Sequence, residues 1–388
     1  MSKACLARAS YITTRLRSSK SKKAVCTGLT AVLAWVLFGS FDGQGHADPT
    51  PIEGFQAPFV FGRFTVPADN PLTEEAFELG RNLFYDPILS GDNTMSCATC
   101  HEQTRGFTDG RARSVGHNGE ELDFNAMALG NLLWGPQLFL WDGRSPSLEH
   151  QALQPLLNPI EMNQPLDALL DELRASAHYQ KMFDAAYGEI SEQAVSKALA
   201  TFVRLLISAD SKYDRYLRGD IKLSDQEEHG RKLFMAHPDV KTSLRGGNCI
   251  DCHSQFVTAG FAEGFDGFSN NGLDSDTDLK PGLSATTDYD GDHGKFKVPS
   301  LRNIAVTGPY MHDGRFETLR EVLNHYNEGI VLSGTLSPLI LEADNEVADP
   351  TQALGLQLTE VEIDAIIAFL HTLTDEAFLS NPKFSNPF

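Results

Sequence analysis

The pentapeptide Cys97-Ala-Thr-Cys-His101 recurs later in the chain as Cys249-Ile-Asp-Cys-His253, so the pattern C-x-x-C-H occurs twice. Each copy follows a related stretch, E-L-G-R-N-L-F at residues 78–84 and E-H-G-R-K-L-F at residues 228–234. The last Phe of the stretch and the His of the pentapeptide are 17 residues apart in the first copy and 19 in the second. One unit is therefore repeated, which predicts two domains related by internal duplication.

Capping boxes predict where two of the helices begin. Ser224 is followed three residues later by Glu227, and Thr359 is followed in the same way by Glu362. An apolar run at residues 363–370 comes after the second box, so we expect the chain to end on an amphipathic helix. The sequence contains no reliable strand pattern. The fold class that it predicts is mainly α.

Polar segments separate these helices and mark the expected domain boundary. The stretch 266–292 is rich in Asp, Gly, Ser and Asn, which predicts a mobile loop. A charged segment at residues 215–222 separates an apolar helix at 198–207 from the second repeat. We therefore expect an N-terminal domain at residues 48–215 and a C-terminal domain at residues 216–388, each with long loops.

The first 47 residues have the composition of an export signal. Seven Lys and Arg residues precede an uncharged apolar run at residues 24–41, and the small residues around Gly45 and Ala47 suit cleavage before Asp48. The alternative is an uncleaved membrane anchor, because this run approaches the ~20 residues that span a bilayer. Both interpretations place the rest of the chain outside the cytoplasm, and cleavage predicts a periplasmic protein.

Removal of this signal leaves a strongly acidic protein. The whole chain has a formal charge of −20, and the signal carries seven basic groups and one acid, Asp42, so the mature chain has a formal charge of −26. This charge argues against nucleic acid as a partner and would attract a basic redox protein. The alternative role of the charge is solubility.

The cysteine count points to the chemistry of the two pentapeptides. Cys5 and Cys26 lie in the signal, and the four remaining cysteines all belong to the C-x-x-C-H patterns, so none is left for a structural disulfide. This pattern attaches c-type haem: two thiols form thioethers, and the following His ligates the iron. We therefore expect two covalent haems. The expected attachment residues and iron ligands are Cys97, Cys100, His101, Cys249, Cys252 and His253.

Two further segments resemble the bacterial di-haem cytochrome c peroxidase and MauG family. Residues 138–162 read LFLWDGRSPSLEHQALQPLLNPIEM, and residues 297–319 read KVPSLRNIAVTGPYMHDGRFETL. The resemblance runs from about Asn70 to the C-terminus. It implies two cytochrome c-like haem domains and an enzyme that reduces peroxide.

The resemblance implies that the haem on His101 is the one that reacts with peroxide. Trp141 matches a tryptophan between the two haems, and Gln151 and Glu161 match a glutamine and a glutamate on the distal side of the reactive iron. Physical chemistry favours this role for Glu161, because a carboxylate among apolar side chains has a raised pKa and can both take and return a proton. The alternative for Glu161 is an exposed loop acid.

The resemblance also implies a calcium ion between the haems. Asn125 matches one of its ligands, and Thr307 and Pro309 match two residues that bind it through backbone carbonyls. His312 matches a histidine near the haem propionates. The expected cofactors are thus two c-type haems and one calcium ion.

Two residues match different subgroups of this family. His117 lies 16 residues beyond His101, in the S-V-G-H position where di-haem peroxidases have a removable sixth iron ligand. At the position of Tyr326 these peroxidases have a methionine, and here the chain resembles MauG-type enzymes instead. Tyr326 is the expected sixth ligand of the haem on His253. Met311 is the competing ligand.

The preferred function is reduction of hydrogen peroxide to water, with electrons from a small c-type cytochrome or cupredoxin. The first alternative is a MauG-type oxidase that modifies a partner protein. The second is a di-haem electron carrier without catalysis, which would have no use for Glu161 and Gln151 beside an iron. We also consider a homodimer.

Overall fold

The computed structural model describes residues 50–388 except 53–57, 59, 60, 62, 63, 136, 137, 257–266, 344 and 347–353. The expected export signal at residues 1–47 lies outside the described residues. The described residues form one compact unit. Within the described ranges no helix is both long and apolar enough to cross a membrane.

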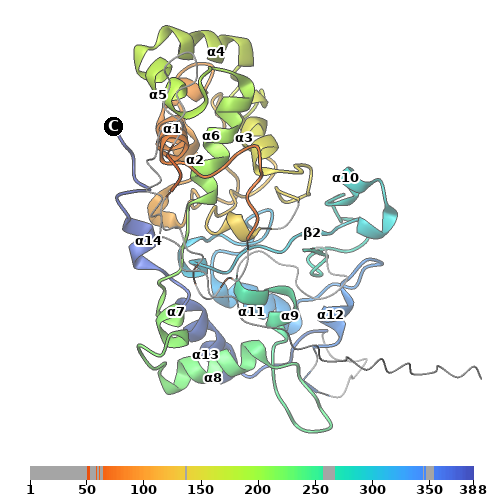
Figure 1. Ribbon diagram of the computed structural model, residues 1–388. Helices are drawn as coiled ribbons and strands as arrows, with labels where there is room; N and C mark the ends of the chain where they lie inside the picture. The colour runs from red at the N-terminus through yellow and green to blue at the C-terminus, as the bar shows by residue number, and fades with distance from the viewer. Residues whose placement is uncertain are drawn as a thin grey trace, which may run out of the picture. The chain divides into compact units, whose positions relative to one another are not determined.

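Helices dominate the described part of the chain, which confirms the mainly α fold class (Figure 1). The first seven are α1 (Glu74–Tyr85), α2 (Cys97–Cys100), α3 (Leu148–Leu157), α4 (Leu166–Ala175), α5 (Ala177–Tyr187), α6 (Glu192–Arg204) and α7 (Lys212–Leu217). The others are α8 (Asp225–Met235), α9 (Cys249–Cys252), α10 (Ser284–Thr287), α11 (Leu319–Glu328), α12 (Pro338–Leu341), α13 (Glu360–His371) and α14 (Glu376–Ser380). The 3-10 helices are η1 (Pro87–Leu89), η2 (Gln103–Arg105), η3 (Leu132–Trp134), η4 (Ser254–Phe256), η5 (Asp290–Asp292) and η6 (Ile304–Val306).

Both expected capping boxes are present. Ser224 and Glu227 cap α8, and Thr359 and Glu362 cap α13, each through reciprocal side chain to backbone hydrogen bonds that satisfy the first amides of the helix. The expectation that the chain ends on the helix α13 was wrong, because the short helix α14 follows it. Asp375 caps α14 by accepting a hydrogen bond from the amide of Phe378.

Two helix pairs form the frame of the fold, and each pair meets at a glycine. The helices α1 and α6 touch at Gly80, where a Cβ atom would overlap the carbonyl oxygen of Ala198. The helices α8 and α13 touch at Gly230, where a Cβ would overlap the carbonyl oxygen of Ala365. Figure 1 shows the first pair in the upper part of the ribbon and the second pair in the lower part. Glycine is therefore required for the close approach of each pair.

The two helix pairs belong to separate hydrophobic clusters. The first cluster is built mainly from residues before position 207, with Phe84 and Phe202 at its centre, and it also takes in Phe378. The second is built from residues 213–373, and Phe234 and Phe369 hold the corresponding places. Burial of such large aromatic side chains is worth roughly 2–3 kcal/mol each, so each cluster stabilises its own helix pair.

Buried polar groups lie beside the second cluster and between it and the first. Asp214 and Arg302 form an ion pair at 2.6 Å, with side chains that are 0% and 1% exposed. Nearby, Asn131 donates to the carbonyl of Ser208 at 2.9 Å, and Asn303 donates to the hydroxyl of Ser208 at 3.0 Å. Removing one partner of a buried, paired charge is costly. These contacts therefore fix the relative placement of the segments around the 3-10 helices η3 and η6.

The segment at 266–292 is more structured than its composition predicts. Its described part, from residue 267, contains the strand β1 (Phe268–Ser269), the helix α10 and the 3-10 helix η5. The strand β1 pairs antiparallel with β2 (Phe296–Lys297), a ladder that the sequence did not predict. Asn270 also donates to the hydroxyls of Ser333 and Thr335, both at 2.9 Å. Long-range hydrogen bonds thus anchor a segment that reads locally as a loop.

Candidate active site

The first pentapeptide forms the one-turn helix α2 followed by His101. The ring atom Nδ1 of His101 lies 2.7 Å from the carbonyl oxygen of Phe107. Because a carbonyl can only accept, Nδ1 must carry the hydrogen, and the lone pair for a metal is then on Nε2. Burial lowers the pKa of His101, against hydrogen bonds to the backbone of Phe107 and Met127 and the charge of Asp109. The imidazole is therefore prepared as a neutral iron ligand.

The second pentapeptide repeats this arrangement with a different acceptor. His253 follows the one-turn helix α9, and its Nδ1 lies 3.1 Å from the carbonyl oxygen of Pro299. Burial lowers the pKa of His253 to about 4. None of the four pentapeptide cysteines is in a disulfide bond within the described residues. Two thiols beside a neutral, oriented imidazole at each site match the requirements of a c-type haem.

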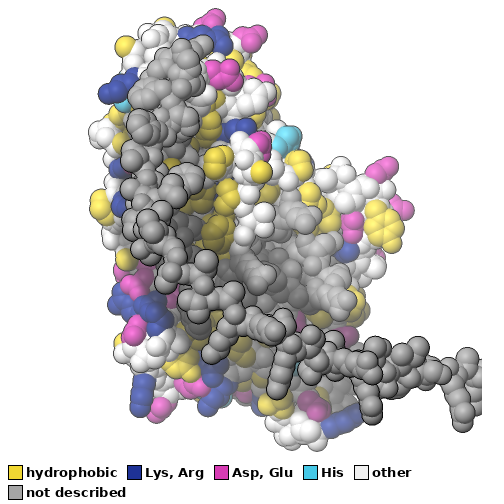
Figure 2. Space-filling model, viewed as in Figure 1, with side chains coloured by type: hydrophobic (Ala, Val, Ile, Leu, Met, Phe, Trp, Pro, Cys, Tyr) yellow, Lys and Arg dark blue, Asp and Glu magenta, His cyan; other side chains and the backbone are white. Residues whose placement is uncertain are grey.

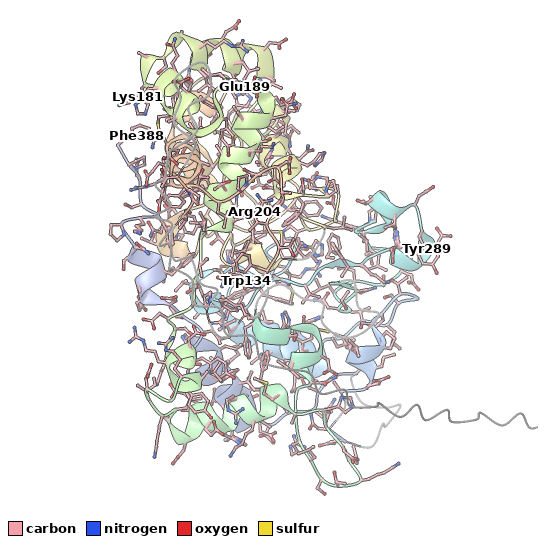
Figure 3. The ribbon with its side chains drawn as sticks, viewed as in Figure 1. Trp134, Lys181, Glu189, Arg204, Tyr289 and Phe388 are labelled. Carbon is pink, nitrogen blue, oxygen red and sulfur yellow. The ribbon has the colours of Figure 1, made fainter. Side chains whose placement is uncertain are left out.

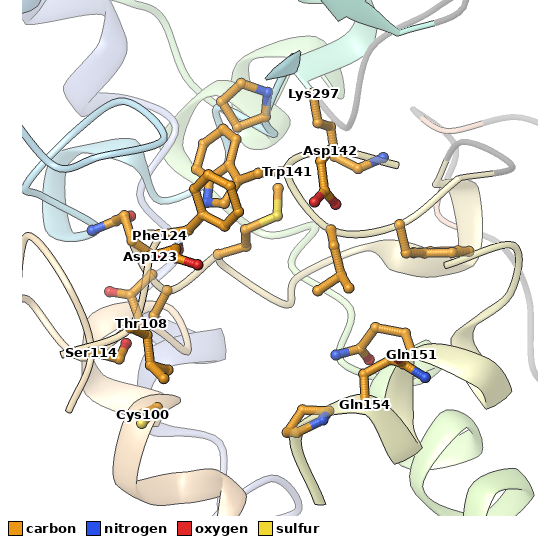
Figure 4. A pocket seen from close by; sticks show the side chains of 18 of the residues that line it. Cys100, Thr108, Ser114, Asp123, Phe124, Trp141, Asp142, Gln151, Gln154 and Lys297 are labelled. Atoms are coloured by element: carbon orange, nitrogen blue, oxygen red, sulfur yellow. Dashed lines mark hydrogen bonds between the residues drawn. The ribbon is translucent and has the colours of Figure 1, made fainter. Parts of the chain in front are cut away.

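A cavity of about 920 Å³ opens beside the first pentapeptide. This volume lies within the usual ~300–1,000 Å³ of ligand-binding pockets. Figure 4 shows Cys100 on one side of it, Gln151 and Gln154 on the opposite side, and Trp141 and Lys297 at the far end. The cavity thus brings together residues of the helix α3 and of the strand β2, which are distant in sequence.

Glu161 lies in this cavity, together with His101 and Gln151. Burial raises the pKa of the Glu161 carboxyl above its ordinary value, against the opposing hydrogen bond of Asn158 and the charge of Arg144. The Nδ2 atom of Asn158 donates to Oε2 of Glu161 at 3.3 Å. The structure therefore places an oriented carboxyl group of raised pKa in the lining of the same cavity as His101.

Trp141 lies at a junction between two segments of the chain. Its side chain is 7% exposed, and its indole Nε1 donates to the carbonyl of Asn125 at 2.8 Å. Its own carbonyl accepts from the amide of Lys297, on β2, at 2.9 Å. The ring is thus fixed in the wall of the cavity.

The three residues expected to bind calcium also line this cavity. They are Asn125, Thr307 and Pro309. The Nδ2 atom of Asn125 donates to the carbonyl of Arg111 at 2.7 Å, which leaves Oδ1 as the side-chain acceptor that a cation would use. No group of three His, Cys, Asp or Glu side chains that could hold a metal ion occurs in the described residues. A calcium site here would depend on amide and carbonyl oxygens.

His117 lies outside the cavity lining. Its Nε2 is 3.2 Å from the carbonyl of Pro159, and its Nδ1 is 3.6 Å from Oδ2 of Asp92. Its backbone amide donates to the carbonyl of Glu161 at 2.9 Å. The structure therefore joins the His117 loop to the Glu161 segment but directs the imidazole toward Asp92 and Pro159.

Tyr326 lies on the helix α11 beside the second pentapeptide. Burial raises the pKa of its hydroxyl to about 12, and the nearby thiols of Cys252 and Cys249 contribute in the same direction. The Nδ2 atom of Asn271 is 3.2 Å from the Tyr326 hydroxyl and 3.4 Å from Sδ of Met311. Both residues expected to compete for the haem on His253 therefore contact the same amide.

His312 is buried, and its ring packs on an aromatic side chain. Its ring stacks on Phe296 with the centroids 3.7 Å apart and the planes 5° from parallel. Its Nε2 atom has no hydrogen-bond partner. Burial lowers the pKa of His312 to about 4. An unpaired ring nitrogen of this kind is suited to a polar group of a bound cofactor.

Lys297 is a cavity residue that the sequence did not reveal. It is 4% exposed, its ammonium donates to the carbonyl of Leu138, and it lies 5.0 Å from the ring centroid of Phe268. Burial lowers its pKa to about 7. A lysine in the sequence K-F-K-V-P reads as a surface residue, because lysines are rarely buried. Only the folded chain shows that this ammonium is desolvated.

Comparisons with known proteins define the class of this chain. The family model described as di-haem cytochrome c peroxidase matches residues 74–222. The methylamine utilization protein MauG of Methylorubrum extorquens is 37% identical, over 80% of this chain and 81% of that protein. The cytochrome c551 peroxidase of Nitrosomonas europaea is 30% identical, over 83% of this chain and 85% of that protein. The chain belongs to the di-haem cytochrome c peroxidase family, which includes the MauG proteins.

Solved structures agree with this assignment. A MauG-like protein associated with microbial copper homeostasis has a TM-score of 0.72 and 36% sequence identity, and the match covers 86% of this chain and 99% of that one. The di-haem peroxidase BthA from Burkholderia thailandensis has a TM-score of 0.64 at 22% identity, covering 82% of this chain and 91% of that one. The second match concerns the fold alone.

Proposed function

We propose that this chain is a di-haem peroxidase that reduces hydrogen peroxide to water with electrons from a small c-type cytochrome or cupredoxin. The observation that carries the proposal is the shared cavity of His101, Gln151 and Glu161. An iron ligand that shares a cavity with a carboxyl group of raised pKa is arranged for proton-coupled chemistry. A simple electron carrier has no need of such a pair.

The residues present fit two c-type haems. Each pentapeptide would hold one haem by two thioethers, with His101 and His253 as the iron ligands. When bound, the haems supply the iron that exchanges electrons with peroxide and with the donor. The orientation of both imidazoles through Nδ1 supports this assignment.

Glu161 is the proposed proton carrier. One peroxide, two protons and two electrons give two molecules of water, so two protons must be supplied, and a proton must also pass from one peroxide oxygen to the oxygen that leaves first as water. The Glu161 carboxyl would accept the proton of one oxygen and deliver it to the oxygen that leaves as water. Gln151 would orient the peroxide by hydrogen bonding. The raised pKa of Glu161 supports this role, because burial makes the carboxylate a stronger base than an exposed one.

Trp141 is the proposed path for electrons between the two haems. It is an oxidisable ring, held between the Asn125 segment and β2, and this placement supports the role. We further propose that a calcium ion binds at Asn125, Thr307 and Pro309. Their common cavity wall is the supporting observation.

The two halves of the chain, residues 48–215 and 216–388, are proposed to be duplicated cytochrome c-like domains. Asn131 and Asn303 support this proposal, because both adopt left-handed conformations, with φ of 63° and 61°, at the start of a 3-10 helix. The side-chain oxygen of Asn131 accepts from the amide of Ser208 at 2.9 Å, and that of Asn303 accepts from the amide of Asp375 at 2.8 Å. Each half therefore contains a left-handed Asn whose side chain accepts a hydrogen bond from a distant backbone amide of the same half.

The donor and the compartment are proposed from charge and chemistry. Figure 2 shows acidic side chains next to basic ones on the face in view, so the net charge of −20 is not gathered in one patch there. An acidic protein favours a basic redox partner. Attachment of c-type haem outside the cytoplasm supports a periplasmic location and a cleaved signal at residues 1–47.

A MauG-type oxidation of a partner protein is the second candidate function. Tyr326 favours it, because it lies next to the thiols of the second pentapeptide at the position where classical di-haem peroxidases have methionine. His117 as a removable ligand of the first haem would require its ring to leave Pro159 and Asp92.

Steady-state peroxide turnover with reduced cytochrome c tests the proposal. Glu161→Gln keeps the size and removes the acid, and we expect turnover to fall by roughly 10²–10⁴-fold with both haems retained. The matched control is Glu189→Gln, an exposed acid just after α5 at the periphery (Figure 3), which should leave turnover unchanged. An unaltered rate in Glu161→Gln would show that Glu161 is not the proton carrier.

A further inference from the structure

The side-chain amide of Asn271 lies between the two side chains that compete for the haem on His253. Its Nδ2 atom is 3.2 Å from the hydroxyl of Tyr326 and 3.4 Å from Sδ of Met311. An amide nitrogen carries two hydrogens, so it can donate to the oxygen and to the sulfur at the same time. One residue therefore controls both candidate ligands.

The position of this amide is fixed by its own backbone and by its neighbours. The carbonyl of Asn271 is 3.0 Å from Nε2 of His325, which precedes Tyr326 on α11. On one side Asn270 accepts from the amide of Ser337 at 3.0 Å, and on the other Gly272 accepts from the amide of Val331 at 2.9 Å. The backbone that carries the amide of Asn271 thus cannot move without breaking long-range hydrogen bonds.

Met311 is constrained independently. Its φ is +75°, a left-handed conformation that an unbranched side chain rarely adopts, and the amide of Tyr310 bonds the carbonyl of Phe316 at 2.7 Å to close the loop that carries it. The sulfur is therefore held where the amide reaches it. A phenolic oxygen accepts a hydrogen bond more strongly than a thioether sulfur does, and it keeps a lone pair for a metal.

We propose that Asn271 is a positioning residue that selects Tyr326 over Met311 as the sixth ligand of the haem on His253. This inference rests on the proposed function, in which a haem is attached at Cys249 and Cys252. The amide directs the oxygen of Tyr326 by hydrogen bonding and engages the sulfur of Met311, which keeps the sulfur from the iron. Loss of the amide should let the two side chains share the position.

The test uses Asn271→Leu in the haem-loaded enzyme, with electron paramagnetic resonance and potentiometric titration as readouts. Tyr326→Phe and Met311→Leu supply the reference spectra of chains that lack one competitor. We expect a single species for the second haem in the wild type and two species in Asn271→Leu, one of them at higher potential, because thioether ligation raises a haem potential. Adding Met311→Leu to Asn271→Leu should restore one species.

A second variant guards against misfolding. Asn271→Asp keeps the shape and replaces the donor by an acceptor, so it should produce the same mixture. Haem content by the pyridine haemochrome assay and the midpoint of thermal unfolding check that each variant is folded. Either folded variant is sufficient for the test.

The outcomes separate this inference from the function on which it rests. A wild-type spectrum and potential in Asn271→Leu, with both changed in Tyr326→Phe, would overturn the role of Asn271 and leave Tyr326 as the ligand. A new species that persists when Met311→Leu is added would also overturn it, because the sulfur would not be its source. If Tyr326→Phe alters neither readout, the ligand assignment itself is wrong.

Discussion

The region around His101 and the region around His253 share a frame but differ on the side where iron would meet a further ligand. In both, a helix pair meets at a glycine, Gly80 or Gly230. In both, the histidine donates through Nδ1 to a backbone carbonyl. Yet the first histidine opens onto a cavity with Glu161, whereas the second lies near the buried Tyr326. The frame is thus common to the two regions, and they differ in the side chains near each histidine.

The two histidines also differ in how they are oriented. His101 donates to Phe107, six residues further along the chain. His253 donates to Pro299, 46 residues further along. The first site is therefore organised by local sequence, and the second depends on the packing of a distant segment. Mutations can test how far the likeness of the two regions extends.

The largest expected effect concerns haem attachment. Replacing Cys97 and Cys100 with Ala, or Cys249 and Cys252 with Ala, should leave one haem bound through denaturation and acid–acetone extraction, against two in the wild type. Thioethers are covalent, so each pair should remove its own haem only. The pyridine haemochrome assay counts the remainder. Loss of both haems from one pair variant would mean that the two regions are not independent.

Lys297 should produce the next largest effect, because it comes from the second half of the chain but lies in the cavity of the first. Its folded pKa of about 7 is below the unfolded value of ~10.4, so between these pH values the unfolded chain binds more protons. Stability should therefore rise with pH across this range, by an amount on the order of a few kcal/mol, and this rise should disappear in Lys297→Met.

Urea unfolding at a series of pH values measures this effect. The control is Lys181→Met, which removes an exposed ammonium at the periphery (Figure 3) and should keep the rise. Equal pH dependence in the wild type and Lys297→Met would indicate that an anion pairs with this ammonium in the complete enzyme.

Smaller effects are expected at the two glycine contacts. Gly80→Ala and Gly230→Ala should each destabilise the protein by about 1–3 kcal/mol, although alanine is the better helix former by ~1 kcal/mol, because the new methyl group meets a backbone carbonyl that cannot yield. Gly130→Ala, where a Cβ would meet only the ring of Phe378 at 3.5 Å, is the control. Chemical denaturation compares the three. An increase in the free energy of unfolding in Gly80→Ala or Gly230→Ala would mean that the helices of that pair are farther apart than these contacts indicate.

Much of this molecule follows from local sequence patterns. The caps at Ser224 and Thr359 form as expected, because a capping box involves residues only three positions apart. The mainly α fold class and the family assignment are likewise confirmed. The segment at 266–292 was misjudged, since its anchors to Ser333 and Thr335 are more than 60 residues away. The proposed roles of Gln151, Trp141 and Tyr326 remain predictions.

The sequence by itself determined the two C-x-x-C-H sites, because thioether attachment and iron ligation need only the spacing of five consecutive residues. Only the tertiary structure decided what lies opposite each histidine. It buried Glu161 beside His101 and raised the pKa of its carboxyl, it desolvated Lys297, and it set the amide of Asn271 between Tyr326 and Met311. Burial and long-range hydrogen bonds arise from packing between distant segments, and no local pattern encodes them.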